Sequence, residues 1–222
     1  MAHEIGNPVT GIACLAQNLE YETDPDEVRY AAQDILKQTE RVSRIVESLV
    51  NFSHTGSDAG NINLHPANLA DCVDEAIHLL TLDHEAKPVE FCNHCDRELV
   101  VMADNQRLLQ VFVNLLGNAR DACDDYGQVH IAAGTEGERV HIDVEDNGCG
   151  IPQELQSQIF EPFYTTQEPG EGTGLGLALV FSIMEDMNGS VQITSPLSTG
   201  ALPGTRVTLQ LPTASYGPEF EV

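Results

Sequence analysis

Apolar residues recur at alternating steps of four and three in the first part of the chain, which is the spacing of one buried stripe on a helix. A second segment after residue 24 repeats apolar positions every seven residues. Between the two segments, Asp24 has the acceptor side chain of an N-cap and Pro25 suits the first position of a helix. The stripes contain Ile5, Val9, Ile12, Ala16 and Leu19, then Val28, Ile35, Val42 and Leu49 beside Ala31, Gln38, Ile45 and Phe52.

These two segments predict an antiparallel helical hairpin over residues 1–55. The apolar seam of such a hairpin is long and narrow, and a lone pair of helices buries it poorly. We therefore expect a homodimer in which two hairpins form a four-helix bundle.

A polar, Gly/Ser-rich linker is expected at 56–61, and after it helical and strand periods are mixed. Asp104 is the expected N-cap of the most strongly patterned helix. The expected helices cover 68–82, 104–123 and 174–188, and the expected strands cover 88–93, 99–102, 127–134, 139–146, 190–195 and 205–211. Helices on one face of a mixed sheet give a two-layer α/β sandwich over residues 62–213, so the chain is of the α+β class. We expect the acidic tail, residues 214–222, to be disordered.

Acidic residues outnumber basic residues by 35 to 10, and the formal net charge is −25. Nucleic acids and anionic membranes both need a basic protein surface, so the composition argues against either as a partner. Any anionic ligand must be held by backbone N–H groups, a helix N-terminus or a metal ion. The longest apolar runs, such as that around residues 108–116, are too short to cross a bilayer.

The six cysteines stand mostly among apolar residues, which is typical of reduced, buried thiols. Cys92 and Cys95 form a C-x-x-C with His94 between them. A zinc site would need a second ligand pair, and none stands out. The segment VEFCNHC also has the pattern of a strand, in which residues three apart face opposite sides. A structural role for the pair is favoured over a metal or redox role, which stays open.

Four glycines in GEGTGLGL, residues 170–177, lead directly into a predicted helix. Glycine lets the backbone come close to a ligand, and a helix N-terminus favours phosphate. The motif is weak on its own, because glycine-rich turns before helices are common. It lacks the Gly-Lys-Ser/Thr ending of a P-loop, and it follows a loop rather than the strand of a dinucleotide-binding fold.

Two further stretches carry groups that suit a nucleotide. In DNGCGI, residues 146–151, the acceptor-only carboxylate of Asp146 can take a hydrogen bond from an exocyclic amine such as that of adenine. A plain turn is the commoner use of such a stretch. Asn114 and Asn118 share a helix face, where amide oxygens can bind a hard cation such as Mg²⁺. A helix that passes from core to surface explains the same pair without a ligand.

In this order, NLLGNARDA, DNGCGI, FEPFYTT (160–166) and GEGTGLGL resemble the N, G1, F and G2 boxes of the histidine kinase ATP-binding domain. That domain belongs to the wider family with gyrase, Hsp90 and MutL. MAHEIGNP resembles the H box of the dimerisation and histidine-phosphotransfer domain. The resemblance extends from Ala2 to Pro212. The chain is thus similar to the catalytic core of a two-component sensor histidine kinase, which implies the Bergerat type of ATP-binding fold with ATP and Mg²⁺ as ligands.

The resemblance implies roles for residues of the ATP-binding domain. Asp146 would bind the adenine amine with support from Thr205, and Asn118 would ligate Mg²⁺ between the phosphates. Asn114 stands where gyrase-like ATPases have a water-activating glutamate, and an amide cannot act as that base, so transfer is favoured over hydrolysis. The other ATP-binding residues implied are Gly148, Gly150 and Ile151 near the base, Phe160 and Phe163 as anchors of the lid, and Gly172, Thr173, Gly174, Leu175 and Gly176 in the glycine-rich stretch.

The implied phosphoacceptor is His3. On a helical wheel it falls about 160° from the stripe residue Ile5, on the outer face beside Asn7. We expect the neutral imidazole of His3 to attack through Nε2 while Glu4, acting as general base, takes the Nδ1 proton. The resemblance also implies that Asn7 orients a water that dephosphorylates the partner regulator.

The match departs from many relatives in its charges. No lysine follows Thr165 and Thr166 in the lid, and Asp121 takes a position that is basic in some relatives. Phosphate charge would then fall mainly on Mg²⁺, backbone N–H groups and the helix dipole. This predicts modest, strongly Mg²⁺-dependent nucleotide affinity.

The expected function is ATP-dependent autophosphorylation of His3, followed by phosphotransfer to an aspartate of a response regulator receiver domain. Two alternatives remain, namely a nucleotide-sensing module that docks regulators without kinase activity and a GHKL-type ATPase. We expect the chain to be the cytoplasmic portion of a membrane-anchored bacterial sensor, preceded by sensor and transmembrane segments. Within residues 1–222 we expect no membrane contact and no nucleic-acid partner.

Overall fold

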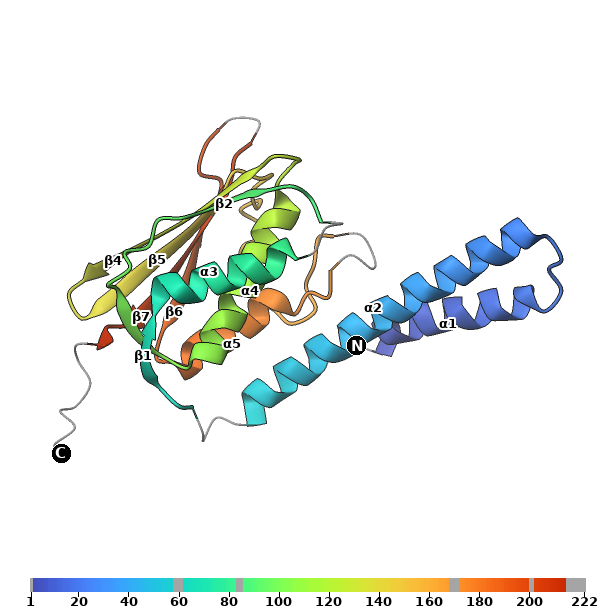
Figure 1. The fold of residues 1–222 in the computed structure, drawn as a ribbon, viewed down its shortest axis with the longest axis horizontal. Coiled ribbons are helices and arrows are strands. Elements are labelled where there is room, and N and C mark those ends of the chain that lie inside the picture. The colour runs from blue at the N-terminus through green and yellow to red at the C-terminus, as the bar shows by residue number, and fades with distance from the viewer. Residues whose placement is uncertain (1, 58–61, 83–85, 168–171, 200–201, 215–222) are drawn as a thin grey trace.

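The computed structural model describes residues 2–57, 62–82, 86–167, 172–199 and 202–214 of the chain. A long helical hairpin stands beside a sandwich of helices on a sheet (Figure 1). This arrangement confirms the predicted α+β class.

The hairpin has the two predicted helices. Asp24 caps the second helix, because its Oδ1 accepts a hydrogen bond from the N–H of Asp26 at 2.9 Å. Its first turn also carries Asp26 and Glu27, whose charges suit the positive end of the helix dipole. The helices are α1 (Ala2–Leu19) and α2 (Pro25–Ser57).

α2 continues to Ser57, so residues 56 and 57 of the predicted linker are helical. The rest of that linker, 58–61, lies outside the described residues, and so does most of the predicted tail, 215–222. None of the described helices combines the length and the apolar character that crossing a bilayer requires.

The sheet of the sandwich has five strands in the order β2-β4-β5-β7-β6, with β2 and β4 parallel and the other pairs antiparallel. β1 and β3 form a separate antiparallel pair. The hydrophobic pattern gives no sign of β1, because its sequence HPAN contains a proline and no apolar alternation. The strands are β1 (His65–Asn68), β2 (Glu90–Asn93), β3 (Val100–Ala103), β4 (Gln128–Glu136), β5 (Arg139–Asp146), β6 (Ser190–Thr194) and β7 (Thr205–Pro212).

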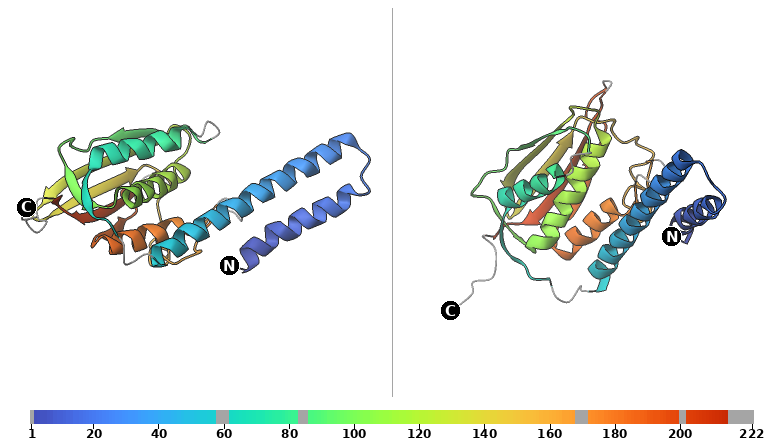
Figure 2. Two further views of the ribbon diagram at one scale, coloured as in Figure 1. Left: turned by 60° about the horizontal axis from the view of Figure 1, so that its bottom comes forward. Right: turned by 45° about the vertical axis from the view of Figure 1, so that its right-hand side comes forward.

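Three helices, α3 (Leu69–Thr81), α4 (Asn105–Ala122) and α5 (Gly176–Asp186), cover one face of the sheet (Figure 2). Along β4, Val129 and Ile131 are buried in the core while their neighbours in the strand are exposed. This alternation is typical of a strand with one packed and one solvated face. We call the solvated side the open face of the sheet.

α4 carries the two asparagines of the predicted site, and its position is fixed at two points. Asp104 Oδ1 accepts hydrogen bonds from two N–H groups of the first turn, at 3.1 and 3.2 Å, so the predicted N-cap is confirmed. An ion pair between Arg107 Nη1 and Asp186 Oδ2, at 2.7 Å, ties α4 to α5. Both of these side chains are largely buried, where an ion pair is screened less by salt than it is at the surface.

The hairpin joins the sandwich through α2. α1 packs on α2, and α2 packs on α5. In all views α2 lies between α1 and the sandwich (Figures 1 and 2). Ile45, from the predicted hairpin seam, is 7% exposed.

Of the C-x-x-C pair, only Cys92 lies in the predicted strand, because β2 ends at Asn93. Cys92 is paired with His130 of β4, whose side chain lies on the open face. Cys95 is buried and belongs to the hydrophobic core. Burial raises the pKa of the Cys95 thiol to about 11, with a contribution from the nearby Asp74 carboxylate. The two thiols therefore do not form a joint ligand pair.

We expect Asp104→Ala to lower the free energy of unfolding by about 1 kcal/mol, because two N–H groups at the start of α4 lose their acceptor. Asp104→Asn is the matched control, since its amide oxygen can accept the same hydrogen bonds. Chemical denaturation followed by circular dichroism measures both variants. An equal loss in the two variants would contradict the capping role.

Candidate nucleotide-binding site

A cavity of about 650 Å³ lies where α4, the start of α5, the loop after β5 and α2 meet. This volume is within the range of small-molecule sites, about 300–1,000 Å³. A narrower cavity of about 70 Å³ shares several lining residues with it, so the two form one hollow. Of the predicted site residues, Asn114, Asn118, Gly150, Ile151, Gly172, Thr173, Gly174 and Gly176 line the larger cavity. Asp146, Asn118, Gly150, Ile151 and Thr205 line the narrower one.

Asp146 stands at the inner end of the hollow, at the last position of β5. Its Oδ1 accepts hydrogen bonds from the N–H groups of Gly148, at 2.9 Å, and Thr205, at 3.2 Å. Burial raises the pKa of the Asp146 carboxyl, and the two backbone hydrogen bonds oppose that shift. Both bonds fall on Oδ1, so Oδ2 is the oxygen that can accept from a ligand amine. Gly148 does not line either cavity, but it lets the loop after β5 pack against the end of α4. A Cβ on Gly148 would lie 2.4 Å from the carbonyl oxygen of Ala122, so a larger residue would push the loop away.

Ser195, which the sequence motifs do not include, ties the inner end together. Its Oγ accepts from the N–H of Ile151 at 2.7 Å, donates to the carbonyl oxygen of Gly204 at 2.9 Å and lies 3.2 Å from Thr205 Oγ1. Gly150 has a φ of +70°, which favours glycine. No sequence signal marks Ser195, because it follows β6, far along the chain from DNGCGI.

The outer end is formed by the start of α5 and one face of α4. No side chain caps α5, so the N–H groups of its first turn are available to an anion. Asn114 Nδ2 donates to the carbonyl oxygen of Gln110 at 2.8 Å. A Cβ on Gly176 would lie 3.1 Å from Asn114 Oδ1 and 3.6 Å from Asn118 Nδ2. The two asparagine amides therefore lie together beside the backbone of Gly176.

Besides Gly148, three predicted ATP-binding residues line neither of the two cavities, namely Phe160, Phe163 and Leu175. The N–H of Phe163 donates to the carbonyl oxygen of Gly174 at 2.8 Å, and both residues have positive φ. A Cβ on Gly174 would lie 2.5 Å from the Phe163 backbone, so only glycine fits. The ring of Phe160 packs against Phe181 of α5, with centroids 5.7 Å apart. Residues 168–171 of the lid lie outside the described residues.

The H box lies on α1, away from this hollow. The backbone of His3 and Glu4 belongs to the start of α1, and their side chains lie outside the described part of the structure. Asn7 is exposed, as the helical wheel predicts. Among the α1 side chains that the structure describes, from Ile5 onward, none lines either of the two cavities. Asn7, the H-box residue whose side chain is described, is therefore not brought together with the pocket.

α2 contributes two residues that the motifs do not include. Arg41 and Ile45 both line the larger cavity. Arg41 is the one cation among the described lining residues, and its Nε is buried with no hydrogen-bond partner among them. The pattern along α2 gives no signal for this, because it describes packing within the hairpin only. The structure thus adds a cation to a pocket whose own motifs lack one.

Two family models match the chain. The His Kinase A (phospho-acceptor) domain matches residues 1–57. The model of the histidine kinase-, DNA gyrase B-, and HSP90-like ATPase matches residues 103–215. The H box falls in the first match, and the four boxes that surround the pocket fall in the second.

Similar proteins include the sensor histidine kinase ZraS of Escherichia coli O157:H7, 33% identical over 214 residues that make up 96% of this chain and 44% of that protein. The sensory histidine kinase/phosphatase NtrB of Rhodobacter capsulatus is 31% identical over 211 residues, which are 88% of this chain and 57% of that protein. This chain thus spans about half the length of these relatives.

A solved structure of the histidine kinase ThkA in complex with the response regulator protein TrrA is similar to this chain with a TM-score of 0.74. The sequence identity is 26%, and the match covers 98% of this chain and 61% of that chain. The matches in sequence and in structure agree with the resemblance found in the sequence motifs.

We expect Arg41→Ala to weaken Mg²⁺–ATP binding by roughly threefold to tenfold, because a partly exposed ion pair contributes on the order of 1 kcal/mol. Lys37→Ala is the matched control, since it removes the same charge from an exposed position of α2 that does not line the pocket. Isothermal titration calorimetry measures both. Equal weakening in the two variants would show a general charge effect and contradict a contact by Arg41.

Proposed function

We propose that this chain, which belongs to the family of histidine kinase-, DNA gyrase B-, and HSP90-like ATPases and carries a His Kinase A domain, is the catalytic core of a protein histidine kinase. The proposed activity is ATP-dependent phosphorylation of His3, followed by transfer of the phosphoryl group to an aspartate of a response regulator receiver domain. One observation carries the proposal. A hollow with Asp146 at its inner end and the uncapped start of α5 at its outer end occurs in one chain with an H box.

The two ends of the hollow favour one direction of bound ATP. The adenine amine would donate to Asp146, whose carboxylate is held by the N–H groups of Gly148 and Thr205. The phosphates would then extend toward Asn118 and the first turn of α5. There, free N–H groups and the helix dipole favour negative charge.

The residues at the outer end fit a Mg²⁺ ion. Asn118 is exposed and offers an amide oxygen, which is a hard ligand, and Gly176 leaves open the space that a side chain would fill beside it. When bound, the ion would neutralise part of the phosphate charge. Asn114 lies in the same cradle and cannot activate water as a carboxylate would, which supports transfer over hydrolysis.

In the proposed reaction His3 is the nucleophile. Its Nε2 forms a bond to the γ-phosphorus while the bond from that phosphorus to the oxygen of the β-phosphate breaks, and ADP leaves. Glu4 takes the proton from Nδ1, so the ring of the product carries no positive charge. Neutral imidazole is the reactive form, because a protonated ring nitrogen has no lone pair with which to attack.

The arrangement of the two domains separates the donor from the acceptor. α1, which carries His3, lies on the far side of α2 from the sandwich (Figures 1 and 2). Arg41 and Ile45 of α2 occupy one wall of the pocket. We infer that phosphorylation needs a movement of the sandwich along the hairpin, or the His3 of a second copy.

The proposed partners are a second copy of the chain, through the hairpin, and a receiver domain. The hairpin leaves large apolar side chains exposed that a second copy would cover, among them Val9, Val28, Leu36 and Val46. The ThkA–TrrA complex shows a similar kinase bound to a response regulator. The proposed location is the cytoplasmic part of a membrane-anchored bacterial sensor, where ATP and receiver domains are present.

Two other functions use the same pocket. A nucleotide-sensing module could dock regulators without phosphoryl transfer, and a GHKL-type ATPase would release phosphate to water. His3 within the His Kinase A match favours the kinase over the first. Asn114 disfavours the second, because an amide is not a general base.

Incubation of the chain with γ-labelled ATP and Mg²⁺ tests the proposal. We expect label on His3 that is lost in acid and stable in base, and no label in His3→Gln. Glu4→Gln should bind ATP normally and label roughly 100-fold more slowly, which is a usual contribution of a general base. Intact ATP binding without any label would favour the docking module. Phosphate release without labelled histidine would favour the ATPase.

We expect Asn7→Ala to lose phosphatase activity toward a phosphorylated receiver domain and to keep autophosphorylation, because Asn7 is exposed on α1 and its amide can orient the attacking water. Asn18→Ala, at another exposed position of α1, is the matched control. The decay of label on a receiver that accepts phosphate from the chain measures the activity. Loss of kinase and phosphatase activity together would indicate a structural role for Asn7.

A further inference from the structure

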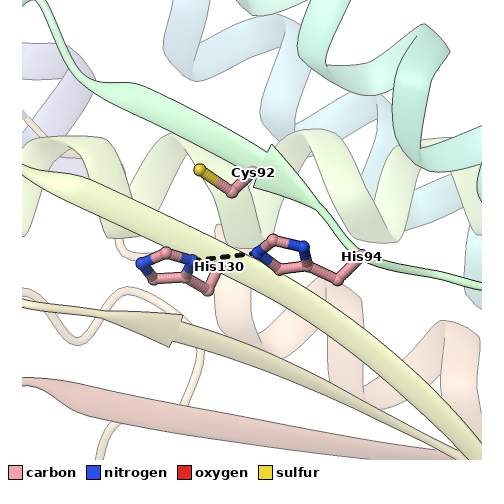
Figure 3. A group of neighbouring side chains, drawn as sticks. All are labelled: Cys92, His94 and His130. Carbon is pink, nitrogen blue, oxygen red and sulfur yellow. Dashed lines mark hydrogen bonds between the residues drawn. The ribbon is translucent and has the colours of Figure 1, made fainter.

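A cluster of one thiol and two imidazoles lies on the open face of the sheet, outside the nucleotide-binding hollow. It consists of Cys92, His94 and His130 (Figure 3). Cys92 and His94 are two residues apart on the edge strand β2 and its extension, so they face the same side. His130 is the register partner of Cys92 on β4. The backbone alone therefore brings the three side chains together.

The positions of these residues are fixed by the sheet. The N–H of His94 donates to the carbonyl oxygen of Ile131 at 2.8 Å, which continues the β2–β4 pairing by one residue. On the same face, Gln128 Nε2 donates to Glu90 Oε2 at 2.9 Å and links the two strands again. The three ligand residues thus rest on paired strands, which hold a site more firmly than a loop would.

The distances within the cluster suit a single metal ion. One donor atom from each residue can be chosen so that all three lie within 4.8 Å of one another. Nε2 of His94 and Nδ1 of His130 are 3.3 Å apart. Two imidazole nitrogens on a tetrahedral Zn²⁺ are about 3.4 Å apart, given bonds of about 2.0–2.1 Å. The two rings are nearly parallel, with an interplanar angle of 11°, and the two nitrogens face each other, so a turn of both rings would direct both nitrogens toward one ion.

The donor set decides which class of ion fits. One thiolate with two imidazoles suits borderline and soft transition metals such as Zn²⁺, whereas Mg²⁺ and Ca²⁺ prefer oxygen. His94 is exposed, so solvent reaches the site. Glu145, the cross-strand neighbour of His130, is bound by Arg206 Nε on the same face. The described residues add no fourth His, Cys, Asp or Glu to this group, so water would take the fourth position.

We propose that Cys92, His94 and His130 form a binding site for Zn²⁺ or a similar borderline transition-metal ion, with water in the fourth position. On binding, the Cys92 thiol loses its proton to solvent and becomes a thiolate. Each imidazole binds as a neutral ligand, with its remaining proton on the nitrogen that faces away from the metal. The bound ion clamps the edge strand β2 to β4. The site is independent of the kinase proposal, because it lies on the other face of the sheet.

The test titrates the metal-free, reduced 222-residue chain with Zn²⁺ in competition with a chromogenic chelator. We expect one Zn²⁺ per chain, and binding weakened by at least about tenfold in both Cys92→Ser and His130→Ala. Cys14→Ser is the matched control, since it removes a thiol of α1 that lies outside the cluster, and it should bind as the wild type does. Co²⁺ in place of Zn²⁺ should give a thiolate charge-transfer band that Cys92→Ser removes.

Two further readouts separate metal binding from a folding defect. Melting of each variant in chelator should match the metal-free wild type, and Zn²⁺ should raise the melting temperature of the wild type and of Cys14→Ser only. Zn²⁺ should also slow hydrogen exchange of the β2 amides in the wild type. Wild-type binding no tighter than that of Cys92→Ser and His130→Ala would overturn the proposal and leave the two histidines as a hydrogen-bonded pair.

Discussion

The binding of an anion by a strongly acidic chain is the constraint on which the rest of the site depends. With a net charge of −25 and acidic residues in and around the lid, the site can draw on few cationic side chains. In the proposed site, backbone N–H groups at the start of α5, two amides on α4 and Arg41 would take over that task. Backbone groups act only at short range, so the chain must come close to the phosphates, as the glycines permit. Binding at short range also requires α4 and α5 to keep one position relative to each other, and the largely buried Arg107–Asp186 ion pair helps to fix that position.

The parts of the fold that the sequence predicts well are those whose causes are local. α4 follows from its periodicity and from Asp104, and β4 and β5 follow from their alternation. The parts that it misses depend on contacts between distant segments. β1 forms only because it pairs with β3. Ser195 reaches the site only because the sheet places the end of β6 beside the loop after β5, where the N–H of Ile151 donates to Ser195 Oγ. No window of the sequence contains both partners of such a contact, so its pattern alone cannot reveal it.

The same distinction applies within the candidate site. Most of the ATP-binding residues that the motifs imply line the hollow, but the motifs do not separate lining residues from those that shape the lid, and they do not include Arg41 and Ile45. Phe163 has positive φ and bonds to Gly174, so it holds the loop and does not line the hollow. The helical wheel predicts that the H box faces outward, but it cannot tell what lies opposite. The position of the hairpin relative to the sandwich is set by the packing of α2 on α5, which also brings Arg41 to the pocket.

The nucleotide pocket and the metal cluster lie on opposite faces of the sheet, at neighbouring residue pairs of β4 and β5. Asp146 of the inner pocket pairs with Val129, and Glu145 pairs with His130 of the metal cluster. A slip of one residue between β4 and β5 would exchange the two faces, so both sites depend on the same register. β4 and β5 pair over eight residues in the interior of the sheet, whereas the edge strand β2 is held by four residue pairs. A metal on the open face should therefore restrain β2 strongly and move Asp146 little, because Asp146 lies on β5, which β4 separates from β2.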